Sequence, residues 1–206
     1  MKVGLFGGTF DPPHLGHLIM AVEVYTYLNL DMLLFMPTYQ NSLKVNAPGA
    51  NPFEREHMLN LMLNDFKGTL WGMHIGVDPY EVNARQIVPS IESLERWAQV
   101  EKVPKEELFF IMGSDNLSSL VRWVRSSEYK DFCQTVLVQR QHTILNIDPN
   151  ELARIQATHN LIFVNPSQKT TISSTEIRKR IGEGKPVFHM LSPSVYNYII
   201  EEGLYR

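Results

Sequence analysis

The chain has 206 residues, of which 44% are hydrophobic and 20% charged, which fits one globular domain with a filled core and excludes a largely disordered chain. Its formal net charge is −3 without a basic block, so the sequence does not favour nucleic-acid binding. The single cysteine, Cys133, excludes an internal disulfide and a cysteine-based zinc site, and its apolar neighbours predict a packed thiol. Because we find no secretion signal and no run of about 18 apolar residues, we expect a cytoplasmic protein that binds no membrane.

Short apolar runs alternate with helical patterns along the chain. The runs, in order, are Val3–Phe6, Met32–Met36, His74–Val77, Leu108–Met112, Val136–Val138 and Leu161–Val164. They show little polar alternation, which is typical of parallel strands buried on both faces. The spacing of apolar residues and the capping residues predict helices at Leu15–Leu28, Phe53–Phe66, Ser90–Val100, Ser174–Ile181 and Ser194–Glu202.

This alternation predicts an α/β fold, with a doubly wound, Rossmann-like parallel sheet flanked by helices in three layers. We expect a single domain over residues 1–206, with the C-terminal helices, from about residue 173 to residue 206, packed on it. In such folds ligands bind at the carboxyl ends of the strands, near the point where the strand order reverses. The polar segment Pro37–Pro52 follows the second predicted strand and is a candidate loop over that site.

The segment after the first predicted strand carries the strongest chemical signal. Gly7-Gly8-Thr9-Phe10 allows a tight turn and a close approach to a ligand, although the same residues also suit a plain strand-to-helix turn. His14 and His17 are three residues apart at a helix entrance, where they would share one face. We expect both imidazoles to hydrogen-bond phosphate oxygens. The alternatives are histidines that only cap the turn and a metal site, for which Asp11 is the only nearby carboxylate.

A second candidate anion site lies far downstream. Ser173, Ser174 and Thr175 are good N-cap residues ahead of a predicted amphipathic helix, and their hydroxyls and free N–H groups form an anion-binding end. Arg178 lies about one turn inside the helix and can reach the same anion. An ordinary capped helix with a solvated basic face remains the alternative for this segment.

Together the two segments resemble the nucleotidyltransferase superfamily that carries H-x-G-H and I-S-S-T-x-x-R. More closely, the chain is similar to the bacterial nicotinate (nicotinamide) mononucleotide adenylyltransferases. The similar stretches are Gly4–His17, Arg55–Leu59, Gly113–Leu117 with Trp123, Ile172–Arg178 and Gly203–Arg206. The resemblance implies an ATP-dependent enzyme of NAD biosynthesis that joins an adenylyl group to nicotinate mononucleotide and releases pyrophosphate.

Two other readings stay open. The same chemistry could act on nicotinamide mononucleotide or another phosphorylated acceptor. A non-catalytic nucleotide-binding module is the more distant alternative, and the presence of His14, His17 and Arg178 argues against it. The sequence leaves the oligomeric state undetermined, with a homo-oligomer among the options.

The resemblance also implies roles for individual residues. His14, His17 and Arg178 are the expected catalytic residues, because they would stabilise charge on the ATP phosphates. The expected ATP-binding residues are Gly7, Gly8, Thr9, Phe10, Gly113, Asp115, Ile172, Ser173, Ser174 and Thr175. The expected mononucleotide-binding residues are Lys44, Ser90 and Trp123, with Trp123 stacked on the pyridine ring. Mg²⁺ would arrive with ATP and needs no dedicated protein site.

The sequence departs from the family pattern at two places. The loop after the second predicted strand lacks the usual histidine and keeps only Lys44, which could equally be a solvated loop lysine. In Val88–Leu94 a serine replaces a threonine and Pro89 replaces an aromatic residue. Because proline has no backbone N–H, this segment leaves the preference between nicotinate and nicotinamide open.

Overall fold

The computed structural model describes residues 1–40, 49–139, 148–168 and 170–206. At its centre is a sheet of six strands, which are β1 (Val3–Gly8), β2 (Met32–Pro37), β3 (Ile75–Val77), β4 (Leu108–Gly113), β5 (Gln134–Val138) and β6 (Asn160–Val164). The strands pair in parallel in the order β3-β2-β1-β4-β5-β6. This order reverses between β1 and β4, so the switch point of the sheet lies where these two strands end. The predicted doubly wound parallel sheet is confirmed.

The helices of the described residues are α1 (Leu15–Leu28), α2 (Pro52–Phe66), α3 (Tyr80–Asn83), α4 (Ser90–Gln99), α5 (Tyr129–Phe132), α6 (Pro149–Thr158), α7 (Ser174–Gly182) and α8 (Pro193–Glu201). Short 3-10 segments lie at Ser114–Arg122, Ser126–Glu128 and Phe188–Met190. The predicted strands and the five predicted helices are confirmed to within two residues at each end. Helices α3, α5 and α6 were missed, because the first two span only four residues each and α6 buries only Ile155. Over the parts of the chain described, no helix is long and apolar enough to cross a membrane.

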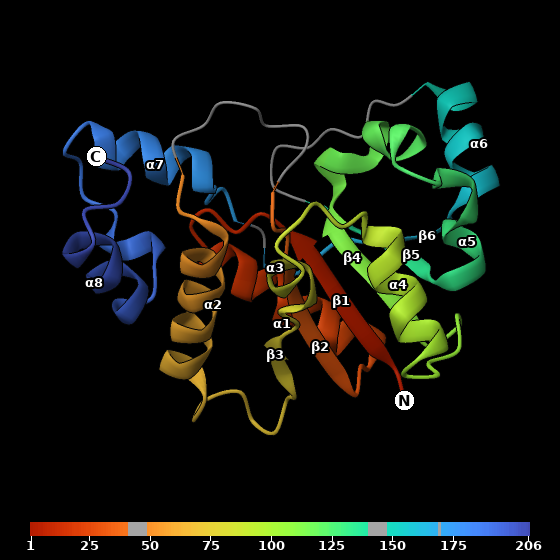
Figure 1. The fold of residues 1–206 in the computed structure, drawn as a ribbon, viewed down its shortest axis with the longest axis horizontal. Coiled ribbons are helices and arrows are strands. Elements are labelled where there is room, and N and C mark those ends of the chain that lie inside the picture. Colours follow the sequence, from red (N-terminus) through yellow and green to blue (C-terminus); the bar gives the residue numbers. More distant parts are fainter. Residues whose placement is uncertain (41–48, 140–147, 169) are drawn as a thin grey trace.

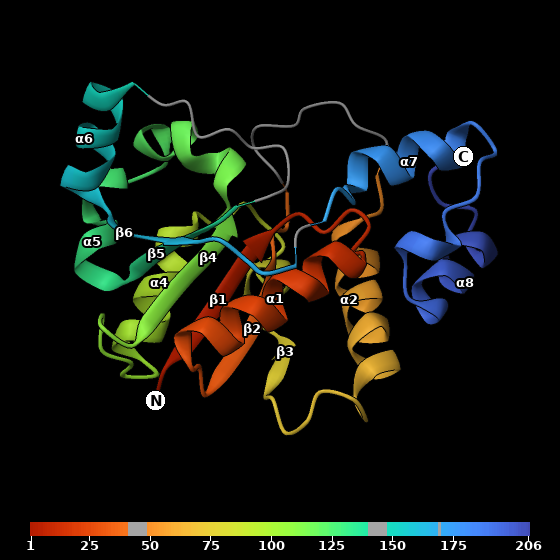
Figure 2. The ribbon, with the colours of Figure 1, turned by 180° about the vertical axis from the view of Figure 1, so that it is seen from behind.

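Apolar side chains cover both faces of the sheet. On one face Phe6 and Ile111 pack with residues of α1, α2, α7 and α8, and on the other Leu5 and Phe110 pack with residues of α4, α5 and α6. Neighbouring positions of one strand contribute to different layers because successive strand side chains point in opposite directions. Figures 1 and 2 show α4 and α1 on opposite sides of the sheet, so the predicted three-layer arrangement is confirmed.

The C-terminal helices lie beside α2. Ser194, in the first turn of α8, donates from its backbone N–H to Asp65 Oδ2 at 2.9 Å and from its hydroxyl to Asp65 Oδ1 at 2.6 Å. Along the same contact, the ring of Tyr198 lies 4.9 Å from that of His57 in α2. Both views show α8 next to α2 and α7 at the edge of the sheet where β1 ends (Figures 1 and 2). This packing brings the end of the chain near the loop that follows β1.

A buried carboxyl group lies on the face covered by α4. Glu81 in α3 is 1% exposed, and the hydroxyl of Ser93 donates to its Oε1 at 3.1 Å. Burial raises the pKa of Glu81 to about 8, because a charged carboxylate at this position would lose its hydration. The Ser93 hydrogen bond lowers this pKa and the nearby Asp78 raises it further, both to a smaller extent.

We expect the substitution Glu81→Gln to make the protein more stable in alkaline solution. The pKa of Glu81 lies above its ordinary value of 4.5 in the folded chain, so the stability that its protonated form contributes is complete below pH 4.5 and is lost as the pH rises toward 8. Glutamine keeps an acceptor for Ser93 but does not titrate. Urea unfolding at pH 9 should therefore give the variant a free energy of unfolding about 2–4 kcal/mol higher than the wild type, with little difference at pH 5.

The control for this prediction is Glu106→Gln, which changes an exposed glutamate in the same way. We expect this control to follow the wild-type stability at both pH values. If Glu81→Gln and the wild type had the same stability at pH 9, the folded chain would hold Glu81 ionised at little cost, and the assignment of a protonated Glu81 would be wrong.

Candidate active site

The loop after β1 leads into α1 through the two predicted histidines. His14 is the N-cap of α1 and His17 lies in its first turn, and their rings stack with centroids 3.6 Å apart and 20° between the planes. The backbone N–H of His14 donates to Nδ1 of His17 at 3.2 Å. Because Nδ1 accepts this bond, Nε2 is the nitrogen of a neutral His17 that carries the proton. The two side chains are 1% and 7% exposed, so the protein itself fixes the orientation of the pair.

Phe10 supports the histidine pair from the side of the core. Its φ of +52° turns the chain so that the ring packs edge to face against His17 at 4.9 Å and against Phe6 at 5.7 Å. A Cβ added to Gly8 would lie 2.8 Å from this ring, and one added to Gly7 would lie 2.8 Å from the ring of Phe110. Both glycines are therefore needed for packing in this structure. Their expected contact with ATP, and that of Phe10, stays a prediction.

The second predicted segment packs directly on the first. The hydroxyl of Ser174 donates to the carbonyl oxygen of Pro12 at 2.8 Å across 162 positions of sequence. Nη1 of Arg178 donates to the carbonyl oxygen of Asp11 at 2.6 Å. Ser173 caps α7 by accepting from the backbone N–H of Glu176 at 3.2 Å. The guanidinium of Arg178 therefore faces the β1 loop, and the alternative of a solvated basic face does not hold for this residue.

Arg55 in α2 ties the same loop to the rest of the sheet edge. Its side chain is almost fully buried, and its guanidinium donates to four carbonyl oxygens. These belong to Thr9 at 2.6 Å, Thr38 at 2.7 Å, Tyr39 at 2.8 Å and Ala50 at 3.3 Å. Burial lowers the pKa of Arg55 from its ordinary value, and the four oxygens replace the water that the guanidinium loses. Arg55 belongs to one of the stretches that resemble the family, but the resemblance implied no role for it.

Gly113 and Asp115 lie at the same edge of the sheet. Gly113 ends β4, the strand next to β1, and Asp115 is exposed in the 3-10 segment that follows. Ile172, just before α7, is half-buried, and Thr175, in the first turn of α7, is exposed. The structure thus brings the predicted ATP-binding residues to the carboxyl edge at the switch point. Lys44 lies outside the described residues.

Trp123 and Ser90 lie on the face of the sheet that α4 covers. The ring of Trp123 packs at 5.9 Å from the rings of both Phe110 and Tyr129, and its Nε1 donates to the hydroxyl of Ser119 at 3.1 Å. Ser90 is the first residue of α4. The histidines belong to the entrance of α1, on the other face. The structure therefore places Trp123 and Ser90 on the opposite side of the sheet from the two histidines.

The metal site that His14 and His17 left open as an alternative would need further ligands at this edge. Over residues 1–40, 49–139, 148–168 and 170–206, no group of three or more His, Cys, Asp and Glu side chains is placed to hold one. Asp11, the carboxylate nearest to the histidines in sequence, already accepts hydrogen bonds from the backbone N–H of Ala50 and the hydroxyl of Tyr205. Both of these hydrogen bonds are accepted by Oδ1, and Oδ2 lies 4.0 Å from Nη1 of Arg178, so the carboxylate helps to hold the loop.

Comparison with known proteins identifies the family. The cytidylyltransferase-like family model matches residues 5–180. The chain is 34% identical to a probable nicotinate-nucleotide adenylyltransferase of Caldicellulosiruptor saccharolyticus over 100% of both proteins, and 31% identical to a nicotinate-nucleotide adenylyltransferase of Bacillus subtilis over 100% of this chain and 98% of that protein. The chain belongs to the nicotinate-nucleotide adenylyltransferase family. Membership of this family of nucleotidyltransferase enzymes confirms the resemblance noted from the sequence.

A solved structure shares the fold of the whole chain. Plasmodium falciparum nicotinic acid mononucleotide adenylyltransferase, complexed with NaAD, superimposes with a TM-score of 0.77 at 17% identity, covering 98% of this chain and 96% of that one. At 17% identity this similarity supports the fold alone. It agrees with the parallel sheet and its flanking helices described above.

We expect Arg55→Met to destabilise the protein strongly. Methionine fills much of the same volume but leaves the carbonyl oxygens of Thr9, Thr38 and Tyr39 without their donor. The free energy of unfolding should fall by about 2–5 kcal/mol in urea titrations. The matched control, Arg154→Met, changes an exposed arginine of α6 and should cost less than about 0.5 kcal/mol. Equal stability of the two variants would show that water replaces the guanidinium at little cost.

Proposed function

We propose that this protein transfers the adenylyl group of ATP to nicotinate mononucleotide and so forms nicotinate adenine dinucleotide and pyrophosphate. One observation carries the proposal beyond family membership. The turn at Asp11 and Pro12, just before the histidine pair, is hydrogen-bonded to Ser174 and Arg178 at the start of α7. Two segments with the residue types that bind phosphate, far apart in sequence, therefore meet at the switch point of the sheet.

The proposed reaction needs alignment and charge stabilisation more than acid or base catalysis. A non-bridging oxygen of the mononucleotide 5′-phosphate attacks the α-phosphorus of ATP, and the bond from that phosphorus to the oxygen bridging to the β-phosphorus breaks. The electron pair of the broken bond leaves with pyrophosphate. Because the attacking phosphate is already an anion at neutral pH, no base has to remove a proton. The protein's contribution is to hold the two phosphates in line and stabilise the developing negative charge.

His17 and the start of α7 can supply this stabilisation. Because Nδ1 accepts from the backbone N–H of His14, a neutral His17 carries its proton on Nε2, the nitrogen that would donate to a phosphate oxygen. The first turn of α7 adds backbone N–H groups, which favour an anion at a helix N-terminus. Arg178 adds a positive charge beside the same turn. In this proposal His14 stabilises the polyphosphate next to His17.

The mononucleotide would bind across the switch point from ATP, on the side of α4. Trp123 offers an aromatic ring for the pyridine ring to stack on. The carboxylate of nicotinate would be favoured near Ser90, because backbone N–H groups of the first turn of α4 attract anions and Pro89 has no side-chain group to cap them. Lys44 remains a proposed phosphate contact from the loop after β2.

We also propose that Mg²⁺ enters the site bound to ATP and has no dedicated site on the protein. Asp11, the carboxylate nearest to the histidines in sequence, supports this proposal, because its Oδ1 already accepts two hydrogen bonds within the protein. Bound to the phosphates, the ion would neutralise part of their charge. A cytoplasmic location and the oligomeric state, with a homo-oligomer as one option, remain predictions from the sequence.

Pyrophosphate release from purified protein tests the proposal. The protein is offered ATP and Mg²⁺ with either nicotinate mononucleotide or nicotinamide mononucleotide, and the dinucleotide product is identified by mass. We expect higher kcat/KM with nicotinate mononucleotide. A higher kcat/KM with nicotinamide mononucleotide would show that the amide, and not the acid, is the preferred substrate. Absence of pyrophosphate with both would contradict both pyridine substrates and favour another phosphorylated acceptor or a non-catalytic nucleotide-binding module.

We predict that His17→Ala lowers kcat by about 100-fold or more, the usual effect of losing one oriented charge stabiliser. The fold should persist, because β1 and α1 keep their other contacts, and circular dichroism checks this. His74→Ala is the control, since His74 is exposed and lies at the amino end of β3, away from the carboxyl ends of the strands where the histidine pair lies. Turnover of His17→Ala close to that of His74→Ala would remove His17 from the proposed mechanism.

We predict that Trp123→Ala raises the KM for the mononucleotide by about 2- to 10-fold and the KM for ATP much less, because an aromatic stack contributes about 0.5–1.5 kcal/mol. Trp71→Ala is the control, since Trp71 is 94% exposed in the loop between α2 and β3. Equal changes in both KM values for Trp123→Ala would argue for a packing role of Trp123 alone.

A further inference from the structure

We infer that Tyr205, near the end of the chain, is a positioning residue for the proposed adenylyl transfer, because its hydrogen bond to Asp11 fixes the loop that carries His14 and His17. The inference rests on the proposed function and concerns a residue for which the family resemblance implied no role. Tyr205 lies in Gly203–Arg206, one of the stretches that resemble the family, and the inference assigns a role to this stretch.

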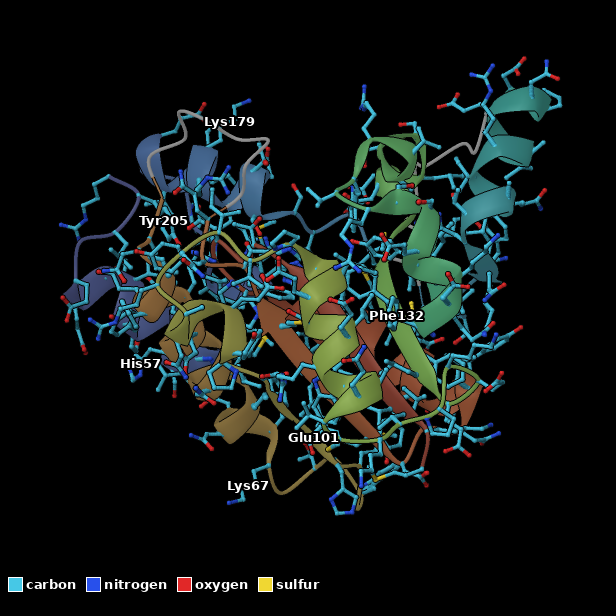
Figure 3. All side chains as sticks on the ribbon, turned by 45° about the vertical axis from the view of Figure 1, so that its right-hand side comes forward. His57, Lys67, Glu101, Phe132, Lys179 and Tyr205 are labelled. Atoms are coloured by element: carbon cyan, nitrogen blue, oxygen red, sulfur yellow. The ribbon has the colours of Figure 1, made fainter. Side chains whose placement is uncertain are left out.

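The hydroxyl of Tyr205 reaches the loop from the far end of the sequence. It donates to Oδ1 of Asp11 at 2.7 Å across 194 positions. The chain turns back toward the loop after α8, where Gly203 has a φ of +64° and Tyr205 itself a φ of +65°. Figure 3 labels Tyr205 close to α7, the helix that supplies Arg178. The left-handed conformation of Tyr205 is unfavourable for a residue with a side chain, so the contacts of Tyr205 hold it there.

The protonation of Tyr205 fixes the direction of this hydrogen bond. Burial raises the pKa of the Tyr205 hydroxyl, and the neighbouring Asp11 carboxylate raises it further. The hydroxyl therefore keeps its proton at neutral pH and donates it to the carboxylate. A hydrogen bond with one charged partner is stronger than one between neutral groups, so the contact can hold the Asp11 side chain in place.

With its side chain held in this way, the backbone of Asp11 is also fixed in position. Its Oδ1 also accepts from the backbone N–H of Ala50 at 2.9 Å, and a Cβ added to Gly49 would lie only 2.2 Å from Oδ2. With its carboxylate held on these sides, Asp11 presents its carbonyl oxygen to Nη1 of Arg178 at 2.6 Å. The same guanidinium nitrogen lies 4.0 Å from Oδ2. Asp11 thus contacts three separate segments, which are Tyr205, Ala50 just before α2, and Arg178 of α7.

The constrained residue lies three positions before His14. Pro12 and Pro13 fill the interval and restrict its backbone, so a shift of Asp11 would be carried toward the histidine pair. Catalysis by alignment is sensitive to such shifts, since a misplacement of about 1 Å can cost about 100-fold in rate. Tyr205 acts through Asp11, so we expect an effect on turnover that is smaller than the loss of a histidine.

The test compares Tyr205→Phe with Tyr198→Phe in the full-length protein. Each variant loses one hydroxyl and keeps its ring. Tyr198, on α8, is a suitable control because its ring contact with His57 survives the change and no hydrogen bond of its hydroxyl is found among the described residues. We expect Tyr205→Phe to lower kcat by about 10-fold, with both KM values changed by less than about threefold. Tyr198→Phe should keep the wild-type kcat.

Thermal unfolding separates a positioning role from a general loss of stability. We expect the Tm of Tyr205→Phe to fall by no more than about 2–4 °C, the shift that the loss of one hydrogen bond produces in a chain of this size, so the protein stays folded under assay conditions. An unchanged kcat in Tyr205→Phe would overturn the inference. An equal loss of kcat in Tyr198→Phe would overturn it as well, because the effect would then not depend on Asp11.

Hydrogen exchange provides a readout that does not depend on activity. Backbone amides of residues 9–17 should exchange about 3- to 10-fold faster in Tyr205→Phe than in the wild type, because the loop opens more often. The same peptide should be unchanged in Tyr198→Phe. Unchanged exchange in Tyr205→Phe would overturn the role of Tyr205 in holding the loop. If wild-type protein released no pyrophosphate while exchange changed as expected, the proposed function would fail and the structural part of the inference would stand.

Discussion

The turn formed by Asp11 and Pro12 is the point on which the carboxyl edge of this protein depends. Its two carbonyl oxygens accept hydrogen bonds from Arg178 and Ser174, and the Asp11 carboxylate accepts two more from Ala50 and Tyr205. A parallel sheet whose order reverses leaves a crevice between neighbouring strands at this edge, and the loops there have no regular partners of their own. The side chains of α7 and of the chain end supply those partners, so the histidine pair belongs to a fixed structure.

Arg55 also holds the loop after β1, but this requires the burial of a charged group. A guanidinium that is 3% exposed has lost its hydration, and four carbonyl oxygens from three segments compensate for that loss. The planar fork of arginine suits this task, because its donors point in several fixed directions, whereas a lysine would present its donors from a single atom. The charge also lies just behind the β1 loop. Its positive potential there would favour a polyphosphate without any direct contact.

The sequence predicts the fold well, because the strands and long helices leave strong local patterns. Pro52 and Asn51 mark the start of α2, and the unalternated apolar runs mark strands covered on both faces. The contact of Arg178 with Asp11, three residues before His14, could be expected only through the family resemblance, since no local pattern encodes a contact across 167 positions. The role of Arg55 was hidden for a similar reason. Its position on the buried face of α2, one turn before Met58 and Leu59, was a visible signal, but its acceptors are backbone oxygens, which every sequence has.

The distances along the chain that separate these partners have a consequence for biosynthesis. The histidine loop is synthesised well before three of the groups that hold it, Ser174, Arg178 and Tyr205, whose contacts with the loop span 162, 167 and 194 positions. Contacts this remote in sequence form late, because closing a long loop costs chain entropy before any contact is gained. A nascent chain can therefore build much of its sheet while its histidines are still unsupported. Nucleotide binding at that edge should therefore begin only after these three residues have been synthesised and have folded back onto the loop.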